Sequence, residues 1–168
     1  TISLLINVLS KKGLYHADYG EVAHTLGVIA EVRPDLITPN TISTLVNTLK
    51  REKDRLDSVS YKPFAYTLGI IAEVKPELIT SDTISTLADI LMKKGLFVST
   101  YIALADAIGF IAQNCSDPIA QQAFSHLIAI LKMEGLDYQL SHLAVANVLN
   151  SIAQSKPKLI TADAILPL

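Results

Sequence analysis

The stretch Thr41-Ile42-Ser43-Thr44-Leu45 occurs four times, with small changes, in this chain of 168 residues. The other copies begin at Thr1, Thr83 and Ala123, so successive copies start 40, 42 and 40 residues apart. A second stretch, Leu26-Gly27-Val28-Ile29-Ala30-Glu31, recurs in step, with counterparts that begin at Leu68, Ile108 and Leu149. A fixed period of this length is typical of proteins built from stacked helical hairpins.

Each unit contains two stretches with the hydrophobic spacing of a helix. In the first stretch, apolar residues stand at i, i+3, i+4 and i+7, which places them on one helix face. In the second unit these residues are Ile42, Leu45, Val46 and Leu49. The apolar face of the second stretch in that unit holds Phe64, Ala65, Leu68, Ile71 and Ala72. The sequence therefore predicts two amphipathic helices in every unit.

Polar residues, glycine and proline mark the ends of these helices. Thr38 and Ser116 predict N-caps of first helices, and left-handed turns after first helices are predicted at Gly13, Gly95 and Gly135. For the second helices, the predicted N-caps are Asp18, Ser60, Thr100 and Ser141, and the predicted stops are Pro34, Pro76, Pro118 and Pro157. The charged residues 50–55 predict a longer, solvated end to one first helix, with a handle for a partner as the alternative.

These repeated features predict an all-α protein, a right-handed α-solenoid of four helical hairpins. We expect a single domain over residues 1–168, with repeats at 1–40, 41–82, 83–122 and 123–163 and a truncated next repeat at 164–168. Because neither end has an evident polar cap, we expect a fragment of a longer array, with self-association through the exposed ends as the alternative. Glycines inside three second helices predict close backbone packing there: Gly27, Gly69 and Gly109.

The pattern Ala23-x-x-Leu26-Gly27-x-Ile29-Ala30, followed by Pro34-x-Leu36-Ile37, resembles the second helix of HEAT repeats, and armadillo repeats are close relatives. The resemblance extends over almost the whole chain and implies that the second helices line a concave face. Two HEAT features are absent: the proline that kinks the first helix, and the arginine seven residues before the leucine. In place of that arginine stand Tyr19, Tyr61, Tyr101 and His142. We expect the tyrosine rings to pack between repeats and the hydroxyls to meet solvent or backbone, with a role in binding as the alternative.

Composition narrows the classes of function. The net charge of −2 gives no electrostatic reason to expect nucleic acid or an anionic membrane as partner. The longest stretch without charged side chains, residues 138–155, contains too many polar residues for a membrane span, and no signal peptide is visible. The single cysteine, Cys115, cannot form an internal disulfide, which favours a reducing compartment. We therefore expect a cytoplasmic protein.

A helical projection at 100° per residue places four positions of each second helix opposite the core. On the concave face implied by the HEAT resemblance, these positions would form the partner-binding surface. The candidate residues are His24, Val28, Glu31, Tyr66, Ile70, Glu73, Asp106, Phe110, Gln113, Asn147 and Gln154.

Two rows within this set differ in character. One is polar and consists of Glu31, Glu73, Gln113 and Gln154; the other is apolar and consists of Val28, Ile70 and Phe110. An apolar row that faces solvent favours a partner-binding role. Burial of the same row against adjacent repeats, through tight curvature, is the alternative.

Residues capable of catalysis or metal binding form no recognisable pattern. The four histidines lie in different units, without the paired spacing of a metal site. Cys115 has no nearby histidine in the sequence, and the glycines lie in predicted helices, not in a phosphate-binding loop. Glu31 and Glu73 are expected to form a solvated ladder, not a general acid–base pair. We therefore expect no enzymatic activity, no metal and no other cofactor.

The expected function is a non-catalytic protein–protein interaction scaffold that binds a peptide, a helix or a folded partner on its concave face. Two alternatives are a nucleic-acid-binding HEAT-like module and a structural subunit of a larger enzyme complex. Lys11, Lys12, Lys93 and Lys94 share a predicted helix-end edge that would suit nucleic acid. The glutamates expected on the inner face disfavour that partner.

Overall fold

The structure is a computed structural model that describes residues 2–133 and 139–160. These residues form eight α-helices and three short 3₁₀ helices, and they contain no β-strand. The α-helices are α1 (Ile2–Ser10), α2 (His16–Val32), α3 (Pro39–Arg51), α4 (Ser58–Val74), α5 (Ser81–Leu91), α6 (Val98–Asn114), α7 (Asp117–Leu131) and α8 (Gln139–Ser155). The 3₁₀ helices are η1 (Pro34–Leu36), η2 (Pro76–Leu78) and η4 (Pro157–Leu159). The predicted all-α class is confirmed.

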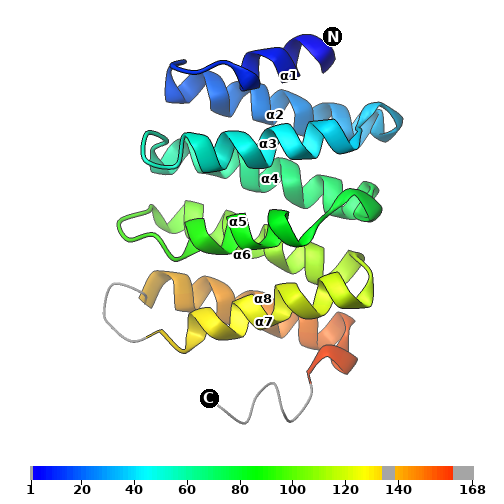
Figure 1. The fold of residues 1–168 in the computed structure, drawn as a ribbon. Helices are drawn as coiled ribbons and strands as arrows, with labels where there is room; N and C mark the ends of the chain where they lie inside the picture. Colours follow the sequence, from blue (N-terminus) through cyan, green and yellow to red (C-terminus); the bar gives the residue numbers. More distant parts are fainter. Residues whose placement is uncertain (1, 134–138, 161–168) are drawn as a thin grey trace.

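The α-helices lie in two layers, and Figure 1 shows the helix pairs in chain order along one axis. In this view α3, α5 and α7 lie in front of α4, α6 and α8. The even-numbered helices pack against one another from α2 to α8, and their mutual contact is far more extensive than that between odd-numbered helices. The predicted truncated repeat at 164–168 and the predicted turn at Gly135 lie outside the described residues.

The predicted apolar stripes form the core wherever a neighbouring helix covers them. Ile42 and Leu45 on α3 and Phe64 on α4 are buried, as their spacing predicts. On α1, Leu9 is buried, whereas Ile2 packs against the core and stays partly exposed. Burial in this fold therefore depends on the next helix along the stack.

The end signals at Thr38, Gly13 and Gly95 are confirmed, and Ser116 occupies the predicted N-cap position of α7 without a side-chain capping bond. Thr38 is the N-cap of α3, and its backbone N–H donates to the hydroxyl of Thr41 at 3.3 Å. Gly13 and Gly95 have φ angles of 81° and 78°, a region that glycine occupies without steric cost.

The starts of the second helices are three residues earlier than predicted. Their N-cap positions in α2, α4 and α6 are Tyr15, Asp57 and Phe97. The carboxyl group of Asp57 accepts from the hydroxyl and the backbone N–H of Ser60, at 2.6 and 2.9 Å, and these bonds lower its pKa. Thr100, another predicted cap, instead donates to the carbonyl of Ser58 at 2.7 Å. The prediction failed because Tyr15 and Phe97 are not capping residue types.

Three tyrosines at equivalent positions of the second helices stabilise the hairpin turns. The rings of Tyr19, Tyr61 and Tyr101 are buried. Each hydroxyl donates to the backbone carbonyl eight residues earlier, at Lys11, Lys53 and Lys93, over 2.8, 2.5 and 2.6 Å respectively. This outcome confirms the expected packing, and it assigns the hydroxyls to the backbone.

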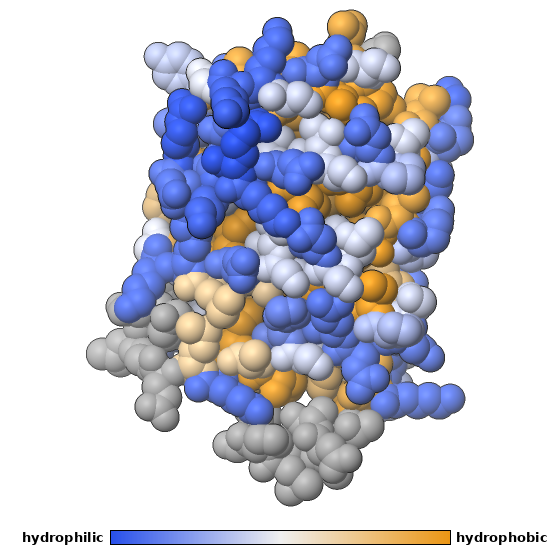
Figure 2. All heavy atoms as spheres, viewed as in Figure 1, coloured by the Kyte–Doolittle hydropathy of each residue, from blue (hydrophilic) through white to orange (hydrophobic). Residues whose placement is uncertain are grey.

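Cations of one hairpin bind carbonyl groups of the hairpin before it. Arg51 donates to the carbonyls of Leu9 and Lys11, at 2.6 and 3.1 Å, and Lys93 donates to that of Lys53. These carbonyls lie near the C-termini of first helices, where positive charge is favourable. Figure 2 shows hydrophilic side chains gathered along this edge of the molecule. Hydrogen bonds of the same kind link successive hairpins at the opposite edge. Lys75 donates to the Ile37 carbonyl at 3.4 Å, and Lys156 donates to the Cys115 carbonyl at 3.0 Å.

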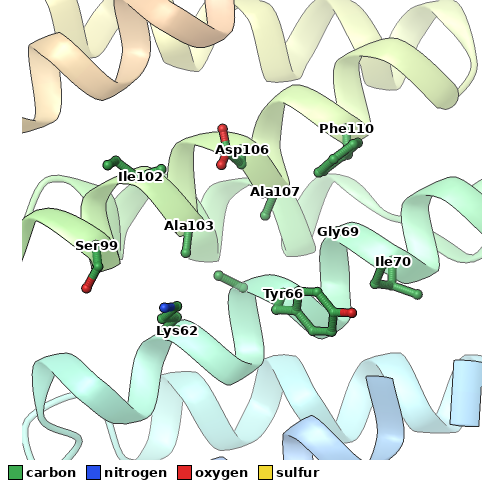
Figure 3. Close-up of a pocket in the computed structure, with 11 residues that line it drawn as sticks. Lys62, Tyr66, Gly69, Ile70, Ser99, Ile102, Ala103, Asp106, Ala107 and Phe110 are labelled. Carbon is green, nitrogen blue, oxygen red and sulfur yellow. The ribbon is translucent and has the colours of Figure 1, made fainter. Parts of the chain in front are cut away.

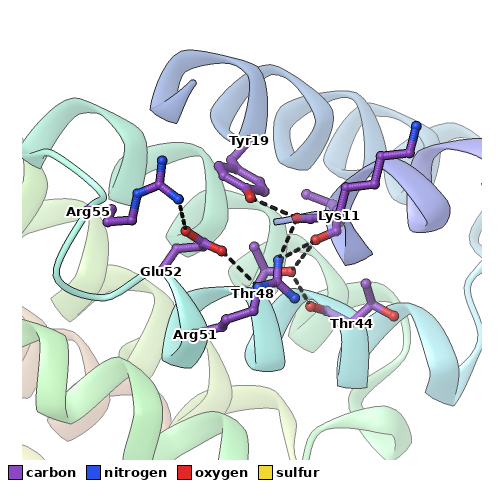
Figure 4. Close-up of polar contacts among 8 residues, drawn as sticks. Lys11, Tyr19, Thr44, Thr48, Arg51, Glu52 and Arg55 are labelled. Carbon is purple, nitrogen blue, oxygen red and sulfur yellow. Dashed lines mark hydrogen bonds and ion pairs between the residues drawn. The ribbon is translucent and has the colours of Figure 1, made fainter. Parts of the chain in front are cut away.

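The charged residues 50–55 do not form the predicted solvated helix end. Helix α3 ends at Arg51, and the side chain of Glu52 is only 4% exposed. Its carboxylate pairs with Arg51 at 2.8 Å and with Arg55 at 3.2 Å, as Figure 4 shows. The bond from Arg51 lowers the pKa of Glu52. The charged stretch that contains the two extra residues of this unit therefore does not extend the helix. It holds a buried, ion-paired carboxylate instead.

Close packing between second helices explains the repeated glycines, as predicted. A Cβ atom placed at Gly27 would lie 2.6 Å from the Thr67 hydroxyl oxygen, and one at Gly109 would lie 2.5 Å from a Val148 methyl group. At Gly69 the nearest atom would be in the Phe110 ring, at 3.3 Å. Each glycine thus allows a residue of the next second helix to approach the backbone.

These distances predict different results for alanine at Gly27 and at Gly69. The Thr67 hydroxyl is buried and donates to the Ala23 carbonyl at 2.7 Å, so Gly27→Ala must break or displace this bond. We expect Gly27→Ala to lower the free energy of unfolding by about 1–2 kcal/mol, despite the better helix propensity of alanine. Gly69→Ala meets a partly exposed ring that can move, and should change it by less than about 1 kcal/mol. Urea unfolding of both variants tests this, and equal stabilities would contradict it.

The carboxylate of Glu52 predicts part of the pH dependence of stability. Because its pKa is lowered in the folded protein, its ionised form stabilises the fold above the unfolded pKa, about 4.3. That stabilisation is lost as the pH falls through the folded pKa. Glu52→Gln should therefore lower stability at pH 7 and lessen the loss between about pH 5 and pH 3.

Thermal unfolding across this pH range measures the effect. The matched control is Asp35→Asn, which removes a carboxylate that is also paired with an arginine, Arg33, but whose side chain is 60% exposed. Exposed ion pairs contribute little to stability. The control variant should therefore lose stability at acid pH nearly as steeply as the wild type does. A Glu52→Gln profile parallel to the wild-type profile would refute the assigned role.

Candidate functional site

A groove of about 360 Å³ lies between α4 and α6, and Figure 3 shows the side chains around it. We call it the α4–α6 groove. Its lining residues on α4 are Lys62, Ala65, Tyr66, Gly69 and Ile70. Its lining residues on α6 are Ser99, Ile102, Ala103, Asp106, Ala107 and Phe110. Four of the predicted site residues are thereby brought together: Tyr66, Ile70, Asp106 and Phe110.

The groove arises from the order of small and large residues along two helices. Small residues recur four positions apart on each helix, as Ala65 and Gly69 on α4 and as Ala103 and Ala107 on α6. This spacing keeps them on one helix side, so they let the two helices approach. Larger side chains are more exposed at the groove, with Tyr66, Ile102 and Phe110 at 41%, 44% and 41%. The result is a mainly apolar hollow with aromatic and aliphatic walls.

One carboxylate borders this apolar hollow. Asp106 makes no hydrogen bond or ion pair with any residue in the described part of the chain. Desolvation by the surrounding protein raises the pKa of its carboxyl group. Asp106 is nevertheless exposed to solvent, so a hydrogen-bond donor or a cation from outside can reach its carboxylate.

A second, smaller hollow of about 140 Å³ lies between α6 and α8. It shares Asp106 and Phe110 with the α4–α6 groove and adds the predicted residues Gln113 and Asn147. The amide of Gln113 donates to the Ser151 hydroxyl at 3.0 Å, which links the two helices at the surface. Asp106 and Phe110 therefore stand between two adjacent hollows.

Three predicted residues meet between α2 and α4. The rings of His24 and Tyr66 lie 5.9 Å apart between centroids. The Tyr66 hydroxyl donates to a carboxylate oxygen of Glu31 at 3.2 Å. Burial and this neighbouring carboxylate raise the pKa of Tyr66. The exposed face thus continues from α2 to the α4–α6 groove through Tyr66.

Other predicted residues do not join the groove. Val28 lines a separate hollow with Ile2, Ile6 and Val32. Glu73 and Gln154 are exposed and line none of the hollows described above. The apolar row matches neither full exposure nor full burial. Val28 and Phe110 are 43% and 41% exposed, whereas Ile70 is partly buried against the core.

The groove also includes residues outside the predicted set. Lys62, Ser99 and Ile102 line the end nearer the starts of α4 and α6. Each lies four residues before a position that the helical projection considered, namely Tyr66, Ala103 and Asp106. A projection extended by one helical turn would therefore have found them.

A comparison of the chain with protein-family models, with curated proteins and with solved structures finds no match. Within residues 2–133 and 139–160, every helix is too short or too polar to cross a membrane. In the same residues, no cluster of three or more His, Cys, Asp or Glu side chains could hold a metal ion.

Proposed function

We propose that this chain is a right-handed α-solenoid of four HEAT-like hairpins and acts as a non-catalytic protein–protein interaction scaffold. Its partner, a peptide, a helix or a folded protein, binds the concave face made by the second helices. The observation that carries this proposal is the α4–α6 groove, because apolar side chains and an unpartnered carboxylate are exposed together there. Contiguous exposed apolar surface is characteristic of binding sites.

The packing of the two layers supports the solenoid and its curvature. Each second helix packs closely on the next, whereas the first helices touch one another much less. A stack that is tighter in one layer bends toward that layer, so the second helices occupy the inner side. The groove then lies on the concave surface, where repeat proteins offer an extended binding face.

The chemistry of the cysteine supports a non-catalytic role. Cys115 is buried, and burial raises the pKa of its thiol to about 11. The thiol is therefore protonated near neutral pH, whereas a nucleophilic cysteine must be a thiolate.

Charge favours a protein partner over nucleic acid. Glu31 and Asp106 are on the groove face, and both would repel phosphate groups. Lys62 is the basic residue among the described lining residues of the groove, and two other cations, Arg51 and Lys93, lie at the turn edge and already donate to backbone carbonyls.

The proposal predicts that truncation of the groove removes specific partners. We compare the double variant Tyr66→Ala/Ile102→Ala with the matched control Leu4→Ala/Tyr15→Ala, in which the two truncated side chains are 69% and 79% exposed on α1 and before α2. Each protein is immobilised and exposed to an extract of the source cells. Partners that the wild type and the control retain should bind the groove variant about tenfold more weakly or worse.

Thermal unfolding must show that both double variants keep the wild-type transition, because all four side chains are exposed. If the groove variant captures the same partners with the same affinity, the proposed binding face is wrong. If the control loses them equally, binding does not reside in the α4–α6 groove.

A further inference from the structure

We infer that the α4–α6 groove binds an amphipathic α-helix with basic character. The bound helix inserts a large apolar side chain between Tyr66, Ile102 and Phe110 and places an arginine or lysine on Asp106. This inference rests on the proposed function and specifies the chemistry of the partner.

The first step is the extent of the apolar surface. Three further large apolar residues, Val59, Phe97 and Val98, are 61%, 61% and 46% exposed at the starts of α4 and α6. They lie near one another, because the backbone N–H of Phe97 donates to the hydroxyl of Ser58 at 2.6 Å. Further exposed apolar side chains therefore lie beyond the Lys62–Ser99 end of the groove. A single exposed apolar side chain is ordinary, but several gathered on two neighbouring helices favour an interface.

The second step is the backbone of the partner. The groove walls are α-helices whose backbone groups are used internally, and the lining offers few polar side chains. An extended peptide would leave its own N–H and C=O groups without partners against this surface. A helix satisfies those groups itself and presents only side chains. The groove therefore selects a helix over an extended strand.

The third step is length. From Ser99 to Phe110 the groove follows twelve residues of α6, a rise of about 16 Å. A partner helix needs about three turns to cover that distance. Its anchors should recur at i, i+3 or i+4, and i+7, the spacing of helices that bind in grooves.

The fourth step is charge. Asp106 is exposed beside the apolar lining and has no hydrogen-bond or ion-pair partner among the described residues, so its carboxylate can pair with a cation on the bound helix. Two glutamates, Glu31 on α2 and Glu73 on α4, add negative charge to the second helices that precede α6. Lys62 is the basic residue of the described lining, and it lies on α4 near the Ser99 end of the groove, whereas Asp106 lies midway along α6 between Ile102 and Phe110. A basic residue midway along the bound helix is therefore complementary to Asp106.

The test uses a displayed library of proline-free amphipathic helices of about 18 residues, randomised on one face and selected on the wild-type protein. Selected peptides should carry a large apolar residue three or four positions from an arginine or lysine, and should become more helical on binding. Asp106→Lys should weaken them at least about tenfold. The matched control is Asp89→Lys, an exposed aspartate on α5, in the other layer, which should leave their affinity unchanged.

A charge reversal makes the assignment specific. A selected peptide whose basic residue is replaced by glutamate should lose binding to the wild type and regain it with the Asp106→Lys variant. Selection of acidic or extended peptides, or no selected helix at all, would overturn the inference. A dimer of this chain that Tyr66→Ala/Ile102→Ala dissociates would also overturn it, because a second copy would then be the occupant. If cellular partners depend on Tyr66 and Ile102 but not on Asp106, the scaffold function stands and this inference fails.

Discussion

The close approach of neighbouring second helices is the constraint on which this structure depends. At Gly27 and Gly109, a side chain of the next helix occupies the space that a Cβ atom would need. The first helices have no equivalent series of glycines, and they touch one another much less than the second helices do. The difference between the two layers, which sets the shape of the stack, therefore follows from a few residues without side chains.

The same small residues that bring α4 and α6 together also create the groove between them. Gly69 packs against Ala107 and the Phe110 ring, and the larger neighbours on each helix are left beside the seam with part of their surface in water. The residues that pack the two helices together and those that line the groove thus occupy adjacent positions of the same helix turns. A substitution that enlarges one of these small residues would alter the shape of the groove before it alters the packing of the helices.

Periodicity in the sequence was sufficient to predict the helices and their buried faces, because burial here repeats with each hairpin. Periodicity was insufficient where a residue differs from those at the equivalent positions of the other hairpins. Glu52 belongs to a charged stretch that reads as solvated, yet two arginines close around it. The groove was predicted in part, since a projection identifies the exposed face of one helix. It cannot give the hollow between two helices, which depends on side-chain sizes about 40 residues apart in the sequence.

Two carboxylates, those of Glu52 and Asp106, have contrasting surroundings. Glu52 is buried between Arg51 and Arg55, which lower its pKa, so its charge stabilises the folded protein at neutral pH. Asp106 is exposed and has no such partner among the described residues, and partial desolvation raises its pKa. The cations at the hairpin edges donate to backbone carbonyls, and none of them reaches Asp106. An exposed carboxylate beside an apolar groove is hydrated in the free protein and can pair with a cation from outside, which supports the proposal that the second-helix face binds a partner.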